Sequence, residues 1–143
     1  MLAYTSPVLT EDLTVIGPLT ATLFVRSSLD HTDFMVRLCD VDQRGKSTNL
    51  SDGIMRLTPV SVTRDERGVI RLEIAMWPTA NCFRRGHRIR LQVSTGAHPL
   101  FARNTGTGEP MASGSALQPA AQEVLHEAGY PSAIAFNVVC LFG

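Results

Sequence analysis

The serines and histidines are the side chains that could do chemistry in this sequence, and their spacing matches no catalytic pattern. A nucleophile elbow requires G-x-S-x-G at a turn from strand to helix, where a strained serine projects its hydroxyl. The nearest stretch, Ser113-Gly114-Ser115-Ala116-Leu117, lacks the second glycine and has no strand before it, so we interpret it as a flexible loop. We therefore predict no catalytic residue in this chain.

The histidines also fail to match the spacing of common zinc sites. They are His31, His87, His98 and His126. None stands in an HExxH or HxH pattern, and no CxxC pair exists. His87 follows Gly86 and precedes an alternating run, which favours a role in a turn. Gly106-x-Gly108 is only a fragment of a phosphate loop, because no lysine follows it. We predict no metal and no cofactor.

Aspartates in the first half of the chain raise the question of a calcium site. They are Asp30, Asp33, Asp40, Asp42 and Asp52. Calcium takes six to eight oxygen ligands, and Asp40 and Asp42 flank Val41, so these two carboxylates could converge. None of the five falls in an EF-hand pattern. A charged strand end before a turn is the preferred interpretation of Asp40 and Asp42, and Asp52-Gly53 is interpreted as a turn.

Charge and cysteine content narrow the class of protein. Thirteen basic residues balance thirteen acidic ones, so no overall field favours nucleic acid or an anionic membrane. A local basic cluster is interpreted as a solvated strand face; it comprises Arg84, Arg85, Arg88 and Arg90. The three cysteines (Cys39, Cys82 and Cys140) are odd in number and widely spaced, which argues against a disulfide framework and fits reduced thiols in a cytosolic protein. With no signal-peptide pattern in the first residues, we expect a cytoplasmic protein.

Short alternating runs dominate the chain and predict β-strands. Apolar residues recur at every second position in five runs, which is the period of a half-buried strand. Asp42–Gly45 and Asp65–Gly68 are predicted to be turns between strands, with Gly45 at positive φ. The predicted core contains Leu23, Val25, Phe34, Val36, Leu38, Leu72, Ile74, Ile89, Leu91, Val93, Phe136 and Val138, and Cys140 is predicted to be a buried thiol.

Two segments depart from this pattern. Gln118–Gly129 has the composition of a helix, with Pro119 at the first turn and Gly129 as a possible cap. Tertiary pairing routinely overrides propensity in so short a window, so composition alone does not decide its conformation. Ala102–Gln118 is predicted to be a long loop, rich in glycine, serine and threonine.

Strands joined by polar turns, with no βαβ spacing, predict one all-β domain over residues 1–143. We expect an antiparallel β-sandwich. Strand periodicity alone does not separate a jelly roll from an immunoglobulin-like sandwich.

Three segments carry a resemblance to a known family. They are Thr32–Val41 (TDFMVRLCDV), Asn49–Arg56 (NLSDGIMR) and Trp77–Ser94 (WPTANCFRRGHRIRLQVS). Their order resembles the C-terminal β-domain of the serine hydrolases that include X-Pro dipeptidyl peptidases, cocaine esterase and α-amino-acid ester hydrolases. The similarity extends from Tyr4 to Val139. It implies a jelly roll of the galactose-binding-like type and catalysis in a separate, preceding α/β-hydrolase domain. It also implies an extended conformation around Val124–His126, in the closing hairpin, and on that basis we predict a strand over Val124–Glu127.

The resemblance implies a non-catalytic accessory domain. Such a domain would pack on the α/β-hydrolase domain, in cis or in trans, and shape its cleft or mediate oligomerisation. We expect the docking face near Asn49–Ile54, Trp77–Phe83 and Pro99–Asn104, and self-association where that face is bare. The alternative is a free-standing carbohydrate-binding module, which fold analogy alone suggests. Trp77 is interpreted as a core or domain-interface anchor rather than a sugar platform.

Overall fold

The computed structural model describes residues 1–95 and 121–139. The chain forms strands in two antiparallel sheets, and the described residues contain no helix. The strands are β1 (Leu2–Thr5), β2 (Leu13–Ser27), β3 (Thr32–Val41), β4 (Ser47–Leu57), β5 (Ile70–Phe83), β6 (Arg88–Ser94), β7 (Gln122–Leu125) and β8 (Ala133–Val139). The all-β sandwich expected from the alternating runs is confirmed, whereas the jelly-roll subtype stays a prediction.

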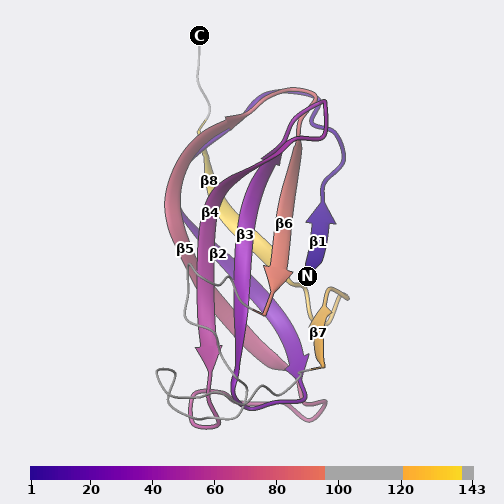
Figure 1. Ribbon diagram of the computed structural model, residues 1–143, viewed down its shortest axis with the longest axis vertical. Helices are drawn as coiled ribbons and strands as arrows, with labels where there is room; N and C mark the ends of the chain where they lie inside the picture. The colour runs from indigo at the N-terminus through magenta and orange to yellow at the C-terminus, as the bar shows by residue number, and fades with distance from the viewer. Residues whose placement is uncertain (96–120, 140–143) are drawn as a thin grey trace.

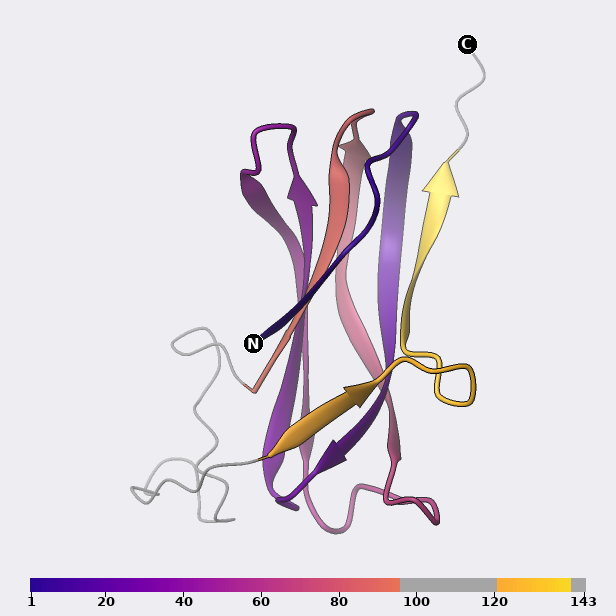
Figure 2. The same cartoon turned by 90° about the vertical axis from the view of Figure 1, so that its right-hand side faces the viewer.

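Strand order separates the molecule into two layers (Figure 1). The first sheet has the order β1-β6-β3-β4. The second has the order β5-β2, with β7 and β8 sharing the far side of β2. Figure 2 shows β8 running beside the first half of β2, and β7 lying nearer its end. One side of the sandwich is therefore formed by β4 and β5, and the opposite side by β1, β7 and β8.

The core lies between the sheets and is built from the alternating rows that the sequence predicts. Buried apolar side chains come from β2, β3 and β5, with Phe83 and Val93 at the ends of β5 and β6. Eight of the twelve predicted core residues are buried. Ile89, Leu91 and Phe136 are partly buried and pack against the same cluster.

Val138 is the predicted core residue that the structure contradicts, because its side chain is 49% exposed. In the pairing of β8 with β2, Phe136 lies opposite Leu19 and Val138 lies opposite Val15, with a bulge in β2 between them. Gly17 in this bulge has φ 111°, a conformation that glycine adopts without a steric penalty. Among the described strands β8 pairs only with β2, so Val138 lies near the end of an edge strand and its side chain stays partly uncovered although Val15 opposite it is buried.

Asp52-Gly53 was predicted to be a turn, and this prediction is wrong. The two residues belong to β4, where Gly53 lies opposite Val36. A Cβ atom on Gly53 would stand 2.8 Å from the carbonyl oxygen of Ala75 and 3.0 Å from the side chains of Ile74 and Met76. Glycine is therefore required because β4 and β5 approach closely here, across the two sheets. The predicted turns at Gly45 and Gly68 are confirmed, with φ of 86° and 75°.

The strand predicted over Val124–Glu127 is shifted toward the amino terminus, since β7 ends at Leu125. Ser132 explains the boundary. Its hydroxyl accepts the backbone N–H of Phe24 at 2.9 Å and donates to the carbonyl of Leu125. Ser132 thus bridges the point at which β2 changes partner from β8 to β7. The helical alternative fails over residues 121–129, and Ala102–Gln118, His98 and Cys140 lie outside the described residues.

We predict that Gly53→Ala lowers the free energy of unfolding by about 1–3 kcal/mol, because the new methyl group meets backbone rather than a movable side chain. Gly129→Ala is the matched control, since no atom lies within 4 Å of its Cβ position and its φ is not positive. Urea denaturation of both variants checks the prediction. Equal stabilities would show that the close approach is not required.

Candidate functional site

Two ion pairs lie on the outer face of the first sheet, between β3 and β4. Arg56 binds Asp33 with both ends of its guanidinium, at 2.8 and 2.7 Å, and Arg37 binds Asp52 in the same way, at 2.6 and 3.1 Å. Each pair joins residues that lie directly opposite in the strand register. Bidentate pairs of this kind fix orientation as well as charge. The side chain of Asp33 is only 1% exposed, so its carboxylate requires these bonds.

The same carboxylates affect the two arginines. Hydrogen bonding to Asp52 raises the pKa of Arg37, and hydrogen bonding to Asp33 raises the pKa of Arg56. The two ion pairs therefore favour the charged form of both guanidinium groups.

Beside these pairs, β4 is tied to β5 across the edge of the sandwich. The hydroxyl of Ser51 donates to the carbonyl of Trp77 at 2.5 Å, two residues before the close approach at Gly53. We call this contact, formed by Ser51, Gly53, Ala75 and Trp77, the seam. The seam joins the NLSDGIMR segment to the WPTANCF segment, and the ion pairs join NLSDGIMR to TDFMVRLCDV.

Asp40 connects two of the same segments at the end of the sandwich where β5 ends and β6 begins. Its carboxylate lies 2.8 Å from Nδ1 of His87 and accepts the side-chain amide of Asn81 at 3.3 Å. His87 therefore occupies a turn, as predicted, and in addition its ring contacts a carboxylate. The residues that carry the family resemblance are thus bonded to one another.

The five aspartates considered for calcium do not converge. Asp30 pairs with Arg64, Asp42 accepts the backbone N–H groups of Arg44 and Lys46 in its own turn, and the other three bind as described above. The bond from Lys46 is the main reason that the pKa of Asp42 is lowered. Within residues 1–95 and 121–139, no group of three or more His, Cys, Asp or Glu side chains could hold a metal ion.

The described histidines lie on separate parts of the domain. His31 precedes β3 at one end, His87 precedes β6 at the other, and the ring of His126 contacts Tyr4 at the side, with centroids 5.9 Å apart. Ser113 and Ser115 lie outside the described residues. Cys39 and Cys82 are free thiols. No helix of the described residues is long and apolar enough to span a membrane.

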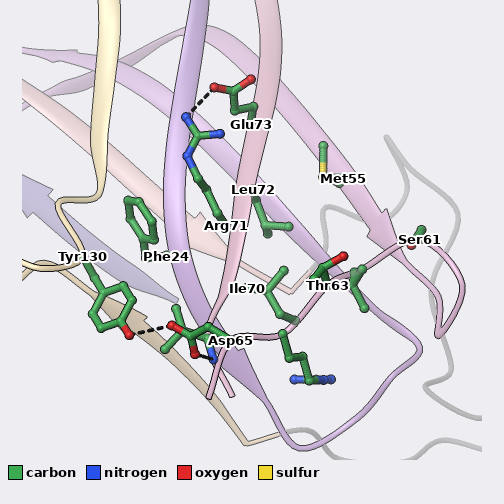
Figure 3. Close-up of a pocket in the computed structure, with 13 residues that line it drawn as sticks. Phe24, Met55, Ser61, Thr63, Asp65, Ile70, Arg71, Leu72, Glu73 and Tyr130 are labelled. Carbon is green, nitrogen blue, oxygen red and sulfur yellow. Dashed lines mark hydrogen bonds and ion pairs between the residues drawn. The ribbon is translucent and has the colours of Figure 1, made fainter. Parts of the chain in front are cut away.

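A pocket of about 580 Å³ lies beside the start of β5 (Figure 3), and no sequence pattern predicted it. At one end, Tyr130 donates its hydroxyl to Asp65 at 2.6 Å, while Asp65 also accepts the backbone N–H groups of Arg67 and Val69. The guanidinium of Arg67 lies 5.1 Å from the ring centroid of Tyr130. These contacts hold the turn before β5 against the hairpin before β8. No local sequence pattern could have shown this, because Asp65 and Tyr130 meet only in the folded chain.

Trp77 is exposed rather than buried in the core, with 56% of its side chain accessible. Trp77 and Pro78 form a bulge in β5, where these two residues lie opposite the single residue of β2 between Gly17 and Leu19. Ile16, 49% exposed, lies opposite Ala80 just beyond the bulge. We call this surface, formed by Ile16, Trp77, Pro78 and Ala80, the Trp77 patch. The seam holds the backbone of Trp77 in place and leaves the indole on the surface.

We predict that Arg56→Met lowers the free energy of unfolding by about 3 kcal/mol, because it removes the bidentate guanidinium group that binds the buried carboxylate of Asp33. Arg71→Met is the control: Arg71 lies 2.7 Å from Glu73, the same separation, but both side chains are more than half exposed. Removing an exposed pair costs about 0–1 kcal/mol. Chemical denaturation measures both values, and equal losses would contradict the proposed importance of burial.

The bond between Tyr130 and Asp65 predicts a pH dependence on both sides of neutrality. It lowers the pKa of Asp65, so its contribution to stability is present above the unfolded pKa of about 4 and is lost as pH falls through the folded pKa. It raises the pKa of Tyr130, so the contribution is present below about pH 10 and is lost as pH rises through the folded pKa.

Tyr130→Phe should therefore make thermal stability less dependent on pH in both windows. Tyr4→Phe is the control in acid, because burial and not a carboxylate raises the pKa of Tyr4, so this change should affect only the window at high pH. A Tyr130→Phe profile that matches the unmodified chain in acid would show that the bond does not form.

Comparison with known proteins shows the family to which this chain belongs. Residues 1–135 match the X-Pro dipeptidyl-peptidase C-terminal non-catalytic domain. The cocaine esterase of Rhodococcus sp. (strain MB1 Bresler) is 42% identical over 113 residues, which cover 76% of this chain and 20% of that protein. A putative serine esterase of Mycobacterium tuberculosis (strain CDC 1551 / Oshkosh) is 28% identical over 124 residues, again with 20% of its length covered.

Solved structures agree with the sequence matches. An α-amino acid ester hydrolase superposes with a TM-score of 0.86 at 25% identity, over 96% of this chain and 25% of that one. An aminopeptidase from a marine sediment archaeon (Thaumarchaeota archaeon) gives a TM-score of 0.82 at 28% identity, over 97% and 26%. The chain thus spans about a fifth to a quarter of these relatives. It belongs to the family of X-Pro dipeptidyl-peptidase C-terminal non-catalytic domains.

Proposed function

We propose that this chain is the accessory domain of a serine hydrolase of the esterase or X-Pro dipeptidyl peptidase type, and that it packs on the α/β-hydrolase domain and helps to shape its cleft. The Trp77 patch is the observation that carries this proposal. Large exposed apolar side chains that gather on one surface mark interaction sites. The domain supplies the surface, and the partner domain supplies the nucleophile.

The polar residues of the family segments support a structural rather than a catalytic role. Asp33, Arg37, Asp52 and Arg56 bind one another, and Ser51 binds backbone. Nucleophilic catalysis instead requires a hydroxyl within reach of a base that a third group orients. His87 and Asp40 do form a base and its orienting carboxylate, but they lie at the end of the sandwich beside Asn81.

The Trp77 patch suits a protein partner. Tryptophan is enriched among the residues that contribute most to binding at protein interfaces. Its backbone is already held by Ser51, so docking would order little more than the indole. Of the three docking segments expected from the sequence, Trp77–Phe83 contains this patch and Pro99–Asn104 lies outside the described residues. Asn49–Ile54 lies in β4, with Ser51, Asp52 and Gly53 buried.

Self-association and sugar binding would use the same indole. A second copy of the chain could cover the patch, and a sugar ring could stack on Trp77. Interfaces between domains of one chain bury roughly 600–1,500 Å². One exposed aromatic side chain cannot supply this area alone, so a docked domain would also contact the residues around Trp77. The length of the relatives favours the hydrolase domain as the partner, because about four-fifths of each curated relative lies outside the match.

The cytoplasmic location stays a prediction.

We predict that Trp77→Ala destabilises the domain only in the context of the hydrolase. The test is a chimera in which residues 1–143 replace the matching fifth of the Rhodococcus cocaine esterase. Trp77→Ala should lower the temperature at which esterase activity is lost by several degrees. In the isolated chain, the same change at an exposed site should alter the free energy of unfolding by less than about 0.5 kcal/mol.

Val60→Ala is the matched control, because Val60 is 95% exposed and lies on the loop before β5, away from the Trp77 patch. It should leave both proteins unchanged. Equal effects of Trp77→Ala in the chimera and in the isolated chain would contradict docking through this patch. Tight, saturable sugar binding that disappears in Trp77→Ala would favour the carbohydrate-binding alternative.

A further inference from the structure

The two sides of the sandwich differ in how they are closed. On the β4–β5 side, the seam brings the sheets together at Gly53 and Ser51. On the opposite side, β1 pairs only with β6, and β8 pairs only with β2, among the strands of the described residues. No ladder connects β1 to β8. This side is open.

An apolar depression of about 430 Å³ lies between β1 and β8 on the open side. Its floor is formed by core residues of both sheets, including Leu23, Leu91 and Phe136. Tyr4 and His126 form one edge through their ring contact. A second depression of about 220 Å³ lies farther along the same side, where Met1 and Leu2 line it with Phe34, Val93 and Val124. We call the two depressions together the open-side groove.

The first residues of the chain belong to this groove. Met1 is 84% exposed and Leu2 is 46% exposed, although both are apolar and line the groove. Figure 1 shows the amino terminus at the start of β1, on the side of the sandwich that also holds β7. Unpaired strand edges with exposed apolar side chains are normally covered in native proteins.

We propose that the open-side groove receives the polypeptide that precedes the matched region in the full-length hydrolases, in extended form, so that it covers β1 and β8 and completes the sandwich. This inference rests on the proposed function, since it takes the domain to be attached to a hydrolase. In this family the domain is the C-terminal one, so other parts of the protein precede it, and here its first strand, β1, lies at the edge of the groove. A tethered segment has an effective concentration in the millimolar range, so modest apolar contacts suffice for occupancy.

Hydrogen exchange of the isolated chain and of the cocaine esterase chimera tests the proposal. The amides of β1 and β8 should exchange about tenfold more slowly, or slower still, in the chimera. The amides of β3, at the centre of its sheet, should be protected in both proteins and serve as the internal reference. The dye 8-anilinonaphthalene-1-sulfonate should bind the isolated chain and not the corresponding surface of the chimera.

Charged substitutions give the second measurement. Leu2→Glu and Ala133→Glu place a carboxylate at exposed positions of the groove, so the isolated chain should keep its melting temperature while the chimera loses several degrees. Val60→Glu, which lies outside the groove, should affect neither protein.

The possible outcomes separate this inference from the proposed function. Protection at the Trp77 patch with unchanged exchange in β1 and β8 would overturn the groove inference and leave the docking of the domain intact. Unchanged exchange at both surfaces would overturn both. A dimer of the isolated chain in sedimentation, with β1 and β8 protected, would show that a second copy fills the groove and would also overturn the inference.

Discussion

The close approach of β4 to β5 at Gly53 is the constraint on which the rest of the sandwich depends. Because Gly53 has no Cβ atom, the backbone of β4 can lie against the carbonyl of Ala75, and the hydroxyl of Ser51 can reach the carbonyl of Trp77. The same strand presents Asp52 and Arg56 to β3. One segment of eight residues, NLSDGIMR, therefore closes one side of the sandwich and binds its central strand.

This arrangement determines where the molecule can bind partners. On the β4–β5 side, the bulge at Trp77-Pro78 is tied to Ser51 through the carbonyl of Trp77, and the side chain of Trp77 is exposed. The opposite side remains open between β1 and β8. The two surfaces suit different roles in a larger hydrolase, since the Trp77 patch fits a folded neighbour and the open-side groove fits an extended segment. Neither surface requires the polar residues of the family segments, which are already bonded within the domain.

Much of the fold could be predicted from residue types alone, because burial between two sheets imposes a period of two. The rows of β2, β3 and β5 illustrate this, and so do the turns at Gly45 and Gly68. The prediction failed where the conformation of a residue depends on a neighbour that is distant in the sequence. Gly53 has the same local surroundings as a turn glycine, and only the position of Ala75 shows that it lies in a strand. Val138 was assigned to the core because the alternating run continues to it, and nothing in that run shows that β8 is an edge strand whose end is left partly uncovered.

The surfaces were harder to predict than the core. Trp77 was interpreted as a core or interface anchor, and the structure excludes the first possibility, since Trp77 continues the exposed row of β5 formed by Arg71, Glu73 and Ala75. The tie between Asp65 and Tyr130 and the open-side groove both join residues more than sixty positions apart. Local patterns carry no record of such contacts, whereas the resemblance to a family of C-terminal domains pointed correctly to the segments that bind one another.

If the chain has an accessory role, none of its serines is an activated nucleophile. Intact-mass spectrometry after incubation with a fluorophosphonate probe measures this in a single experiment, because such probes react with serines that a neighbouring base activates. We predict that the isolated chain keeps its mass while the cocaine esterase chimera gains one phosphonyl group. A phosphonylated serine in the isolated chain would contradict the accessory role.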